Sequence, residues 1–255
     1  MIEQGKVITE TNNGIAVISF FHPQSNSLPG TLLRALAVEI AKAGNDVKAK
    51  VIVIKSDGDK TFCAGASFDE LASITTIEEA IIFFSGFAEV INAMRKAPKF
   101  ILVRVQGKAV GGGIGVACAG DYTLAVSSAS VKLSELAVGI GPFVVGPAVE
   151  RKIGTSAFTQ MTINAAQWHT AEWAKEKGMY ANIYNTIEEL DNGINELAGV
   201  LAASNPEAMM MLKKIMWEST VHWDQLLLER AEMSGKLVLS DFTRNAIARF
   251  KQGAR

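Results

Sequence analysis

Two stretches of the chain share one order of parts: a short apolar run, a loop of small residues, and then a helical pattern. In the first, residues 51–54 (VIVI) lead into residues 60–71 (KTFCAGASFDEL). In the second, residues 101–105 (ILVRV) lead into residues 107–121 (GKAVGGGIGVACAGD). Short apolar runs bounded by turn residues are typical of fully buried strands in a parallel sheet. Because a helix follows each run, the two stretches predict an α/β fold.

The rest of the chain fits an α/β core followed by a helical part. The Asn13-Gly14 pair predicts a tight turn between two strands, and residues 31–46 and 77–97 have apolar residues at helical spacing. From residue 187 the pattern is helical almost throughout, with a break at Asn205-Pro206. We therefore expect an α/β core in residues 1–190 and a helical region in residues 191–255. The shorter elements expected are two strands with a turn in residues 121–140, helical pieces in residues 145–154, 155–163 and 167–179, and a strand in residues 181–184.

Composition excludes several classes of protein. Of the 255 residues 49% are hydrophobic, and the net charge is −1 without a basic stripe, so we expect no nucleic-acid partner. There is no run of about 18 apolar residues and no basic start followed by an apolar stretch, so we expect neither a membrane span nor a signal peptide. Cys63 and Cys118 have no metal-type spacing. Reduced, packed thiols and a cytoplasmic location are expected.

Each glycine-bearing loop precedes a helix, and that position has a chemical meaning. The first amides of a helix have no partner within the helix and favour negative charge. Glycine and alanine allow a ligand atom to approach this backbone closely. Two such loops side by side would direct two N–H groups at one oxygen, which is the arrangement of an oxyanion hole. The alternative is that the glycines only allow tight packing. The G-x-G-x-x-G dinucleotide pattern and the phosphate-binding P-loop pattern are both absent.

Four segments, in order, resemble motifs of the crotonase (enoyl-CoA hydratase/isomerase) superfamily. Residues 25–30 (SNSLPG) resemble its Asn-Ala-Leu loop, and residues 60–71 and 105–125 resemble its two oxyanion segments. Residues 240–250 (SDFTRNAIARF) are similar to its closing helix motif. The resemblance covers nearly the whole chain. One departure is Ser67, which stands where an aspartate is common in the family.

The resemblance implies a fold, a substrate class and a set of site residues. The implied fold is a spiral of ββα units, with residues 191–255 helping to form a homotrimer or a dimer of trimers. The implied substrate is an acyl-CoA thioester, with no cofactor beyond the CoA that the substrate carries. By position, the backbone N–H groups of Ala66 and Gly112 would bind the thioester oxygen of an enolate-like intermediate. The further substrate-binding residues expected are Cys63, Ala64, Gly65, Gly111, Gly115 and Phe143.

Glu135 is the candidate acid/base. It lies among apolar residues before a glycine-bearing loop, where partial desolvation would raise the pKa of its carboxyl group, although a solvated surface glutamate is the alternative. The resemblance matches Glu135 to one of the two glutamates of the family's hydratases, and the other falls on Gly115. A single carboxylate favours moving a double bond, from 3-enoyl-CoA to 2-enoyl-CoA. Hydration with Glu135 and a water held by other groups is the alternative, and a non-catalytic acyl-CoA-binding protein is another.

Other polar residues have simpler interpretations. His22, His169 and His222 have no partner at the spacing of a nucleophile or a metal site, so structural roles are expected. Asp121, at the end of the glycine-rich helix, is expected to be structural as well. Basic residues near the C-terminus would contact the CoA phosphates or lie on a solvated helix face; these are Lys213, Lys214, Arg244, Arg249 and Lys251.

Overall fold

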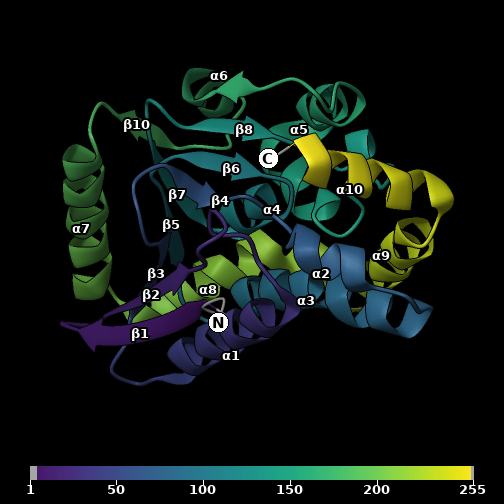
Figure 1. Ribbon diagram of the computed structural model, residues 1–255. Coiled ribbons are helices and arrows are strands. Elements are labelled where there is room, and N and C mark those ends of the chain that lie inside the picture. Colours follow the sequence, from purple (N-terminus) through teal and green to yellow (C-terminus); the bar gives the residue numbers. More distant parts are fainter. Residues whose placement is uncertain (1–4, 254–255) are drawn as a thin grey trace.

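Two sheets form the core of this α/β protein (Figure 1). The computed structural model describes residues 5–253, and the side chains of residues 5–250. The six-stranded sheet has the order β1 (Lys6–Asn12), β2 (Ile15–Phe21), β3 (Val51–Ser56), β5 (Ile101–Val105), β7 (Tyr122–Val126) and β10 (Asn182–Tyr184). The four-stranded sheet has the order β4 (Thr61–Cys63), β6 (Lys108–Val110), β8 (Ser130–Lys132) and β9 (His169–Thr170).

The chain alternates between the two sheets as it advances. Along the chain, β3 is followed by β4, β5 by β6, and β7 by β8, so that each strand of the larger sheet leads to one of the smaller sheet. Helical structure comes after each of these pairs. The strands β2, β3, β5, β7 and β10 pair in parallel, and β1 pairs with β2 as the antiparallel hairpin predicted from Asn13-Gly14. The predicted spiral of ββα units is therefore confirmed. The two strands predicted in residues 121–140 are present as β7 and β8, but they lie in different sheets.

Helices cover the sheets, and their ends follow the local sequence. They are α1 (Gly30–Asn45), α2 (Phe68–Ser73), α3 (Ile77–Lys96), α4 (Gly112–Ala119), a 3₁₀ turn η1 (Leu136–Val138), α5 (Gly146–Ile163) and α6 (Ala171–Glu176). Helix α3 begins with a capping box between Thr76 and Glu79 and ends just before Pro98. Helix α5 is kinked at Gly154, which has a φ of 76°. The two helical pieces expected in residues 145–154 and 155–163 therefore form one interrupted helix.

The C-terminal part is helical, as expected, but it is divided more often than predicted. It contains α7 (Ile187–Ala203), α8 (Pro206–Trp217), a 3₁₀ turn η2 (Glu218–Thr220), α9 (Trp223–Val238) and α10 (Asp241–Gly253). The boundary expected at residue 190 falls inside α7, which packs against the strands β3, β5 and β7. Figure 1 shows α7 at one side of the strands and α9 and α10 at the opposite side.

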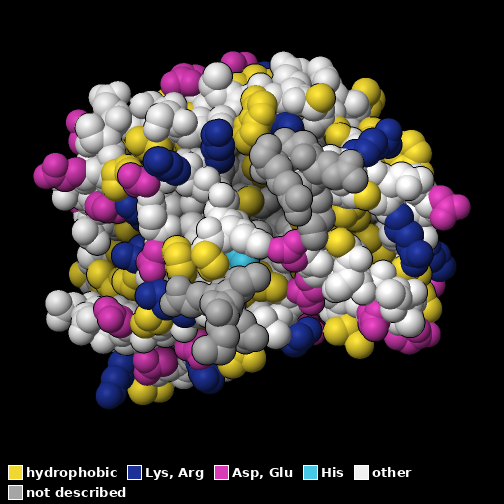
Figure 2. All heavy atoms as spheres, in the orientation of Figure 1, with side chains coloured by type: hydrophobic (Ala, Val, Ile, Leu, Met, Phe, Trp, Pro, Cys, Tyr) yellow, Lys and Arg dark blue, Asp and Glu magenta, His cyan; other side chains and the backbone are white. Residues whose placement is uncertain are grey.

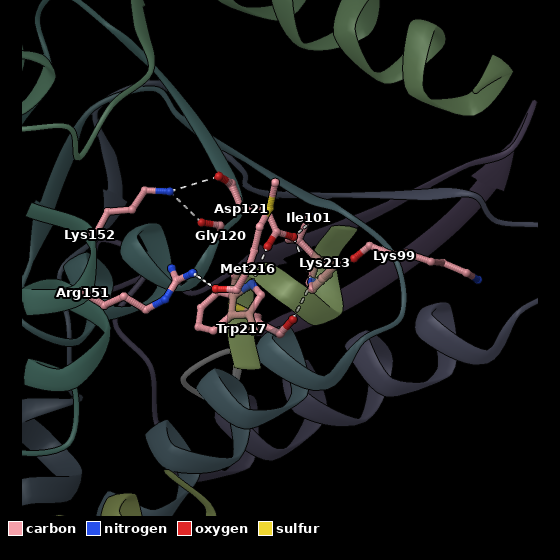
Figure 3. A network of polar contacts seen from close by, with 10 residues as sticks. Lys99, Ile101, Gly120, Asp121, Arg151, Lys152, Lys213, Met216 and Trp217 are labelled. Atoms are coloured by element: carbon pink, nitrogen blue, oxygen red, sulfur yellow. Dashed lines mark hydrogen bonds and ion pairs between the residues drawn. The ribbon is translucent and has the colours of Figure 1, made fainter. Parts of the chain in front are cut away.

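A buried polar network holds α8 against the core (Figure 3). The carboxylate of Asp121, which follows α4, accepts hydrogen bonds from Lys213 Nζ at 2.9 Å and Trp217 Nε1 at 2.7 Å. Lys213 Nζ also donates to the carbonyl oxygens of Met94 and Lys99. Asp121 thus has the structural role expected of it, whereas Lys213 is 2% exposed and lies neither on a solvated face nor at a phosphate site.

The outer surface carries charges of both signs. On the face shown in Figure 2, lysine and arginine side chains are interspersed with acidic ones. None of the helices within residues 5–253 combines the length and the hydropathy that a membrane span requires.

Candidate active site

A cavity of about 70 Å³ lies where the two glycine-bearing loops meet the helices. Its walls come from the loop between β4 and α2, from α2, α3 and α9, from the loop between β6 and α4, and from the segment between β8 and α5. The lining residues are Ala64, Gly65, Ala66, Phe68, Leu71, Phe84, Phe87, Gly111, Gly112, Ser134, Glu135, Val138, Ile140, Gly141, Pro142, Phe143, Val144, Val145 and Ser234.

Strand pairing brings the two glycine-bearing loops together. Because β4 pairs in parallel with β6, both strands release their loops at the same edge of the smaller sheet. The loops are in close contact: a Cβ atom at Gly65 would lie 3.3 Å from the amide nitrogen of Gly112. Within the described residues, the amides of Ala66 and Gly112 donate no hydrogen bond. Gly112 is the first residue of α4, where an amide has no intrahelical acceptor. Two unpaired N–H groups therefore lie in the lining of one cavity.

The glycine run is required by backbone shape and by close neighbours. Gly111 has a φ of 52°, in the left-handed region that other residues rarely adopt, and the turn there starts α4. A Cβ at Gly112 would lie 2.6 Å from the ring carbon Cζ of Phe87, and one at Gly113 would lie 2.6 Å from the carbonyl oxygen of Cys63. The glycines thus allow the turn to pack closely against α3 and against the end of β4, as the packing interpretation of this motif expects.

Two of the expected substrate-binding residues do not line the cavity. The Cys63 side chain is fully buried; its Sγ accepts a hydrogen bond from the Gly65 amide at 3.3 Å, and burial raises the pKa of the thiol to about 12. Gly115 faces Val145 instead, because a Cβ at Gly115 would lie 2.7 Å from Val145 Cβ. Val145 itself lines the cavity, so its side chain occupies the side of α4 on which a residue larger than glycine would project.

Glu135 directs its carboxylate at the start of α4. The residue as a whole is partly buried, but Oε2 is enclosed and has no hydrogen-bond partner among the described residues. Oε1 lies 3.1 Å from the position that a Cβ at Gly111 would take, so a side chain there would crowd the carboxylate. Burial raises the pKa of Glu135 from 4.5 to about 7. A carboxyl group with this pKa can both take and return a proton near neutral pH.

The remaining predicted residues are distributed as follows. Ala64, Gly65, Ala66, Gly111, Gly112, Glu135 and Phe143 all line the cavity. Ser67 accepts a hydrogen bond from the Glu70 amide at 3.4 Å and caps α2, so serine supplies the local N-cap where the family often has aspartate. His22 and His169 lie outside the lining, and the described residues hold no cluster of three or more metal-ligating side chains.

Sequence reasoning missed the apolar wall of the cavity. Phe68 and Leu71 come from α2, and Phe84 and Phe87 come from α3. Their signal in the sequence is an ordinary amphipathic helix, which does not distinguish side chains that fill the core from side chains that border a cavity. Ser234 in α9 was missed because it lies far along the chain from the other residues that line the cavity.

The chain is similar in sequence to known proteins. Residues 10–251 match the family model "Enoyl-CoA hydratase/isomerase". The human mitochondrial methylglutaconyl-CoA hydratase is 30% identical over 211 residues, which is 81% of this chain and 62% of that protein. The short-chain-enoyl-CoA hydratase of Clostridium acetobutylicum is 27% identical over 84% of this chain and 81% of its own length.

Solved structures share the same fold. The crystal structure of enoyl-CoA hydratase from Bacillus halodurans superposes with a TM-score of 0.88, covering 95% of this chain and 99% of that one at 20% identity. The family match extends over almost all of the described residues. The chain therefore belongs to the enoyl-CoA hydratase/isomerase family of enzymes.

Proposed function

We propose that this protein moves the double bond of an enoyl-CoA thioester from the 3-position to the 2-position, with Glu135 as the acid/base. One observation carries the proposal: Glu135 is the single carboxylic acid, and the single ionisable side chain, among the described residues that line the cavity. Moving a double bond requires that a proton be taken from one carbon and returned to another, which one group of suitable pKa can do.

The proposed reaction has two proton transfers that balance. The ionised carboxylate of Glu135 takes a proton from C2 of the 3-enoyl thioester, and the electron pair of the C–H bond moves toward the thioester oxygen. The amides of Ala66 and Gly112 donate hydrogen bonds to this oxygen, and each such donor contributes about 3–4 kcal/mol to transition-state stabilisation. The protonated Glu135 then gives its proton to C4, which leaves the double bond between C2 and C3. No water is consumed, and no cofactor is needed beyond the CoA of the substrate.

Hydration of 2-enoyl-CoA is the second candidate, and the names of the relatives favour it. Hydration requires a water molecule held against the double bond. The second carboxylate that would hold it is missing at Gly115, and Val145 fills that side of α4. Ser134 and Ser234, which also line the cavity, are the residues whose hydroxyl groups are left to hold such a water.

The test is a parallel assay of purified protein with 3-enoyl-CoA and 2-enoyl-CoA. We expect conversion of the 3-enoyl form without hydration of the 2-enoyl form. Glu135→Gln should lower the isomerisation rate by about 100- to 10,000-fold, whereas Glu188→Gln, at an exposed glutamate of α7, should leave it unchanged. Rapid hydration would contradict isomerisation, and binding of acyl-CoA without turnover of either substrate would favour a non-catalytic role.

We also propose that the chain forms a homotrimer or a dimer of trimers in the cytoplasm. The support is a row of exposed apolar side chains on α8, consisting of Met210, Met211, Leu212, Ile215 and Met216. These side chains are between 44% and 62% exposed in the single chain, which is typical of a surface that another subunit covers. The helical region of residues 191–255 would then act in assembly, and no nucleic-acid partner is proposed.

A further inference from the structure

The cavity is small for a ligand site. Its volume of about 70 Å³ is well below the roughly 300–1,000 Å³ of pockets that enclose a drug-sized ligand. The thioester carbon and oxygen take part of this space. What remains suits a short acyl chain.

Two packed helices close the cavity on the side of α3 and α9. Phe84 and Phe87 of α3 line the cavity, and so does Ser234 of α9. At the next residue, Gly235, a Cβ would lie 3.2 Å from Ala80 Cβ and 3.3 Å from Ile77 Cδ1. The two helices are therefore in contact beside the cavity, and a longer chain has no channel between them.

The ring of Phe84 is held in place by its neighbours. The Phe83 ring makes an edge contact with Phe84, with 5.3 Å between the ring centroids, and another with Phe87 at 6.1 Å. Phe84 is 8% exposed and lines the cavity, whereas Phe83 is buried behind it and does not. Moving a packed aromatic ring to admit a longer chain would disturb all three side chains.

The lining also lacks a partner for a charged acyl group. Among its described residues the polar side chains are Ser134, Glu135 and Ser234, and none carries a positive charge. The Ser234 hydroxyl donates to the carbonyl oxygen of Arg230 at 3.1 Å. A second carboxylate in the cavity would be buried close to Glu135 without a cation to pair it.

We infer that the acyl subsite takes a short, uncharged acyl chain, and that Phe84 sets the limit on its length. The inference rests on the proposed function in one respect, namely that this cavity binds the acyl part of an acyl-CoA. It does not depend on which reaction follows.

Binding of saturated thioesters tests chain length without any chemistry. Isothermal titration calorimetry of the full chain would be performed with butanoyl-, hexanoyl-, octanoyl- and dodecanoyl-CoA. We expect affinity to fall by at least about tenfold between hexanoyl- and octanoyl-CoA, because excess methylenes do not fit. Adipoyl-CoA, which has the length of hexanoyl-CoA and a terminal carboxylate, should bind at least about tenfold more weakly than hexanoyl-CoA. Equal affinities along the series would overturn the inference.

Matched variants test the role of Phe84. Phe84→Ala should raise the affinity for octanoyl-CoA by about tenfold, and Phe84→Leu, which removes less volume, should raise it by a smaller factor. Phe20→Leu is the control, since it makes the same change at a buried ring that does not line the cavity and that packs on Phe62 rather than on Phe84. If Phe84→Ala does not fold, Phe84→Leu against Phe20→Leu still decides the matter. An equal change in both leucine variants would refute the assignment of Phe84.

The outcomes separate this inference from the proposed function. A preference for short chains in binding, with no conversion of short 3-enoyl-CoA, would contradict isomerisation and support the inference. Conversion of 3-enoyl-CoA with no preference for chain length in binding would support isomerisation and contradict the inference. If no acyl-CoA binds at any length, both are wrong.

Discussion

At the scale of single residues, the burial of Glu135 links its proposed role as acid/base to stability. Its pKa is raised to about 7 in the folded protein by burial, so the folded state retains a proton that the unfolded chain releases above pH 4.5. The contribution of Glu135 to stability must then fall as pH rises from about 4.5 to about 7, because at this group the unfolded state binds fewer protons in this range. Below this range both states are protonated and there is no cost.

We therefore predict that the effect of Glu135→Gln on stability depends on pH. The free energy of unfolding of the variant, minus that of the unchanged protein, should be larger at pH 8 than at pH 4.5. A shift from 4.5 to about 7 corresponds to about 3 kcal/mol in the free energy of unfolding. Urea denaturation at several pH values measures the difference. The control is Glu188→Gln, for which the difference should not vary with pH; a flat difference for Glu135→Gln would mean that its carboxylate is solvated.

Gly115 offers a second prediction at this scale, because its neighbour Val145 explains why it is glycine. Gly115→Ala should destabilise the protein by about 1–3 kcal/mol through overpacking, since the added Cβ would lie 2.7 Å from Val145 Cβ. In a Val145→Gly background, which lacks both the Cβ and the methyl groups of Val145, the same change should be neutral, or stabilising by up to about 1 kcal/mol, because alanine favours a helix interior. A double-mutant cycle of unfolding free energies checks this. Equal effects in the two backgrounds would show that Val145 does not exclude a side chain at Gly115.

At the scale of elements, the attachment of α8 depends on one buried ion pair. Lys213→Met leaves the Asp121 carboxylate without its cationic partner at 2.9 Å, and breaking a buried pair in this way costs about 3–5 kcal/mol. Lys214→Met is a matched control, because the next residue on the same helix is exposed; we expect a change within about 0.5 kcal/mol. Denaturant unfolding monitored by tryptophan fluorescence measures both, and similar losses in the two variants would contradict a specific role for Lys213.

At the scale of the whole molecule, the exposed face of α8 predicts assembly. Light scattering on purified protein should give three or six times the chain mass of 27.3 kDa. Ile215→Glu places a charge on a residue of α8 that is 62% exposed in the single chain, and it should lower the mass toward that of one chain. Val47→Glu, at a residue that is 95% exposed outside this face, should not. A monomer before any substitution would refute the proposed trimer.

Much of the fold follows from local rules, so the sequence was sufficient to predict it. Apolar runs, turn pairs and helical spacing depend on neighbours within a few residues, and they predicted the hairpin, the parallel strands and the helical C-terminal part. Such patterns do not say which strands share a sheet, so the separation of β7 and β8 into different sheets could not be predicted. The divisions around η2 and before α10 were missed because no proline marks them.

The sequence by itself determined the succession of strands along the chain, the two glycine-bearing loops and the presence of one glutamate that follows them. Each of these features depends on residues close together in the chain. Only the tertiary structure decided what those residues face. Val145 lies against Gly115, Phe84 and Ser234 close the cavity, and Lys213 reaches Asp121, although 92 positions separate the last two. Contacts of this kind arise from the packing of distant segments, and a periodic pattern records only that a residue is apolar or polar, not which neighbour it meets.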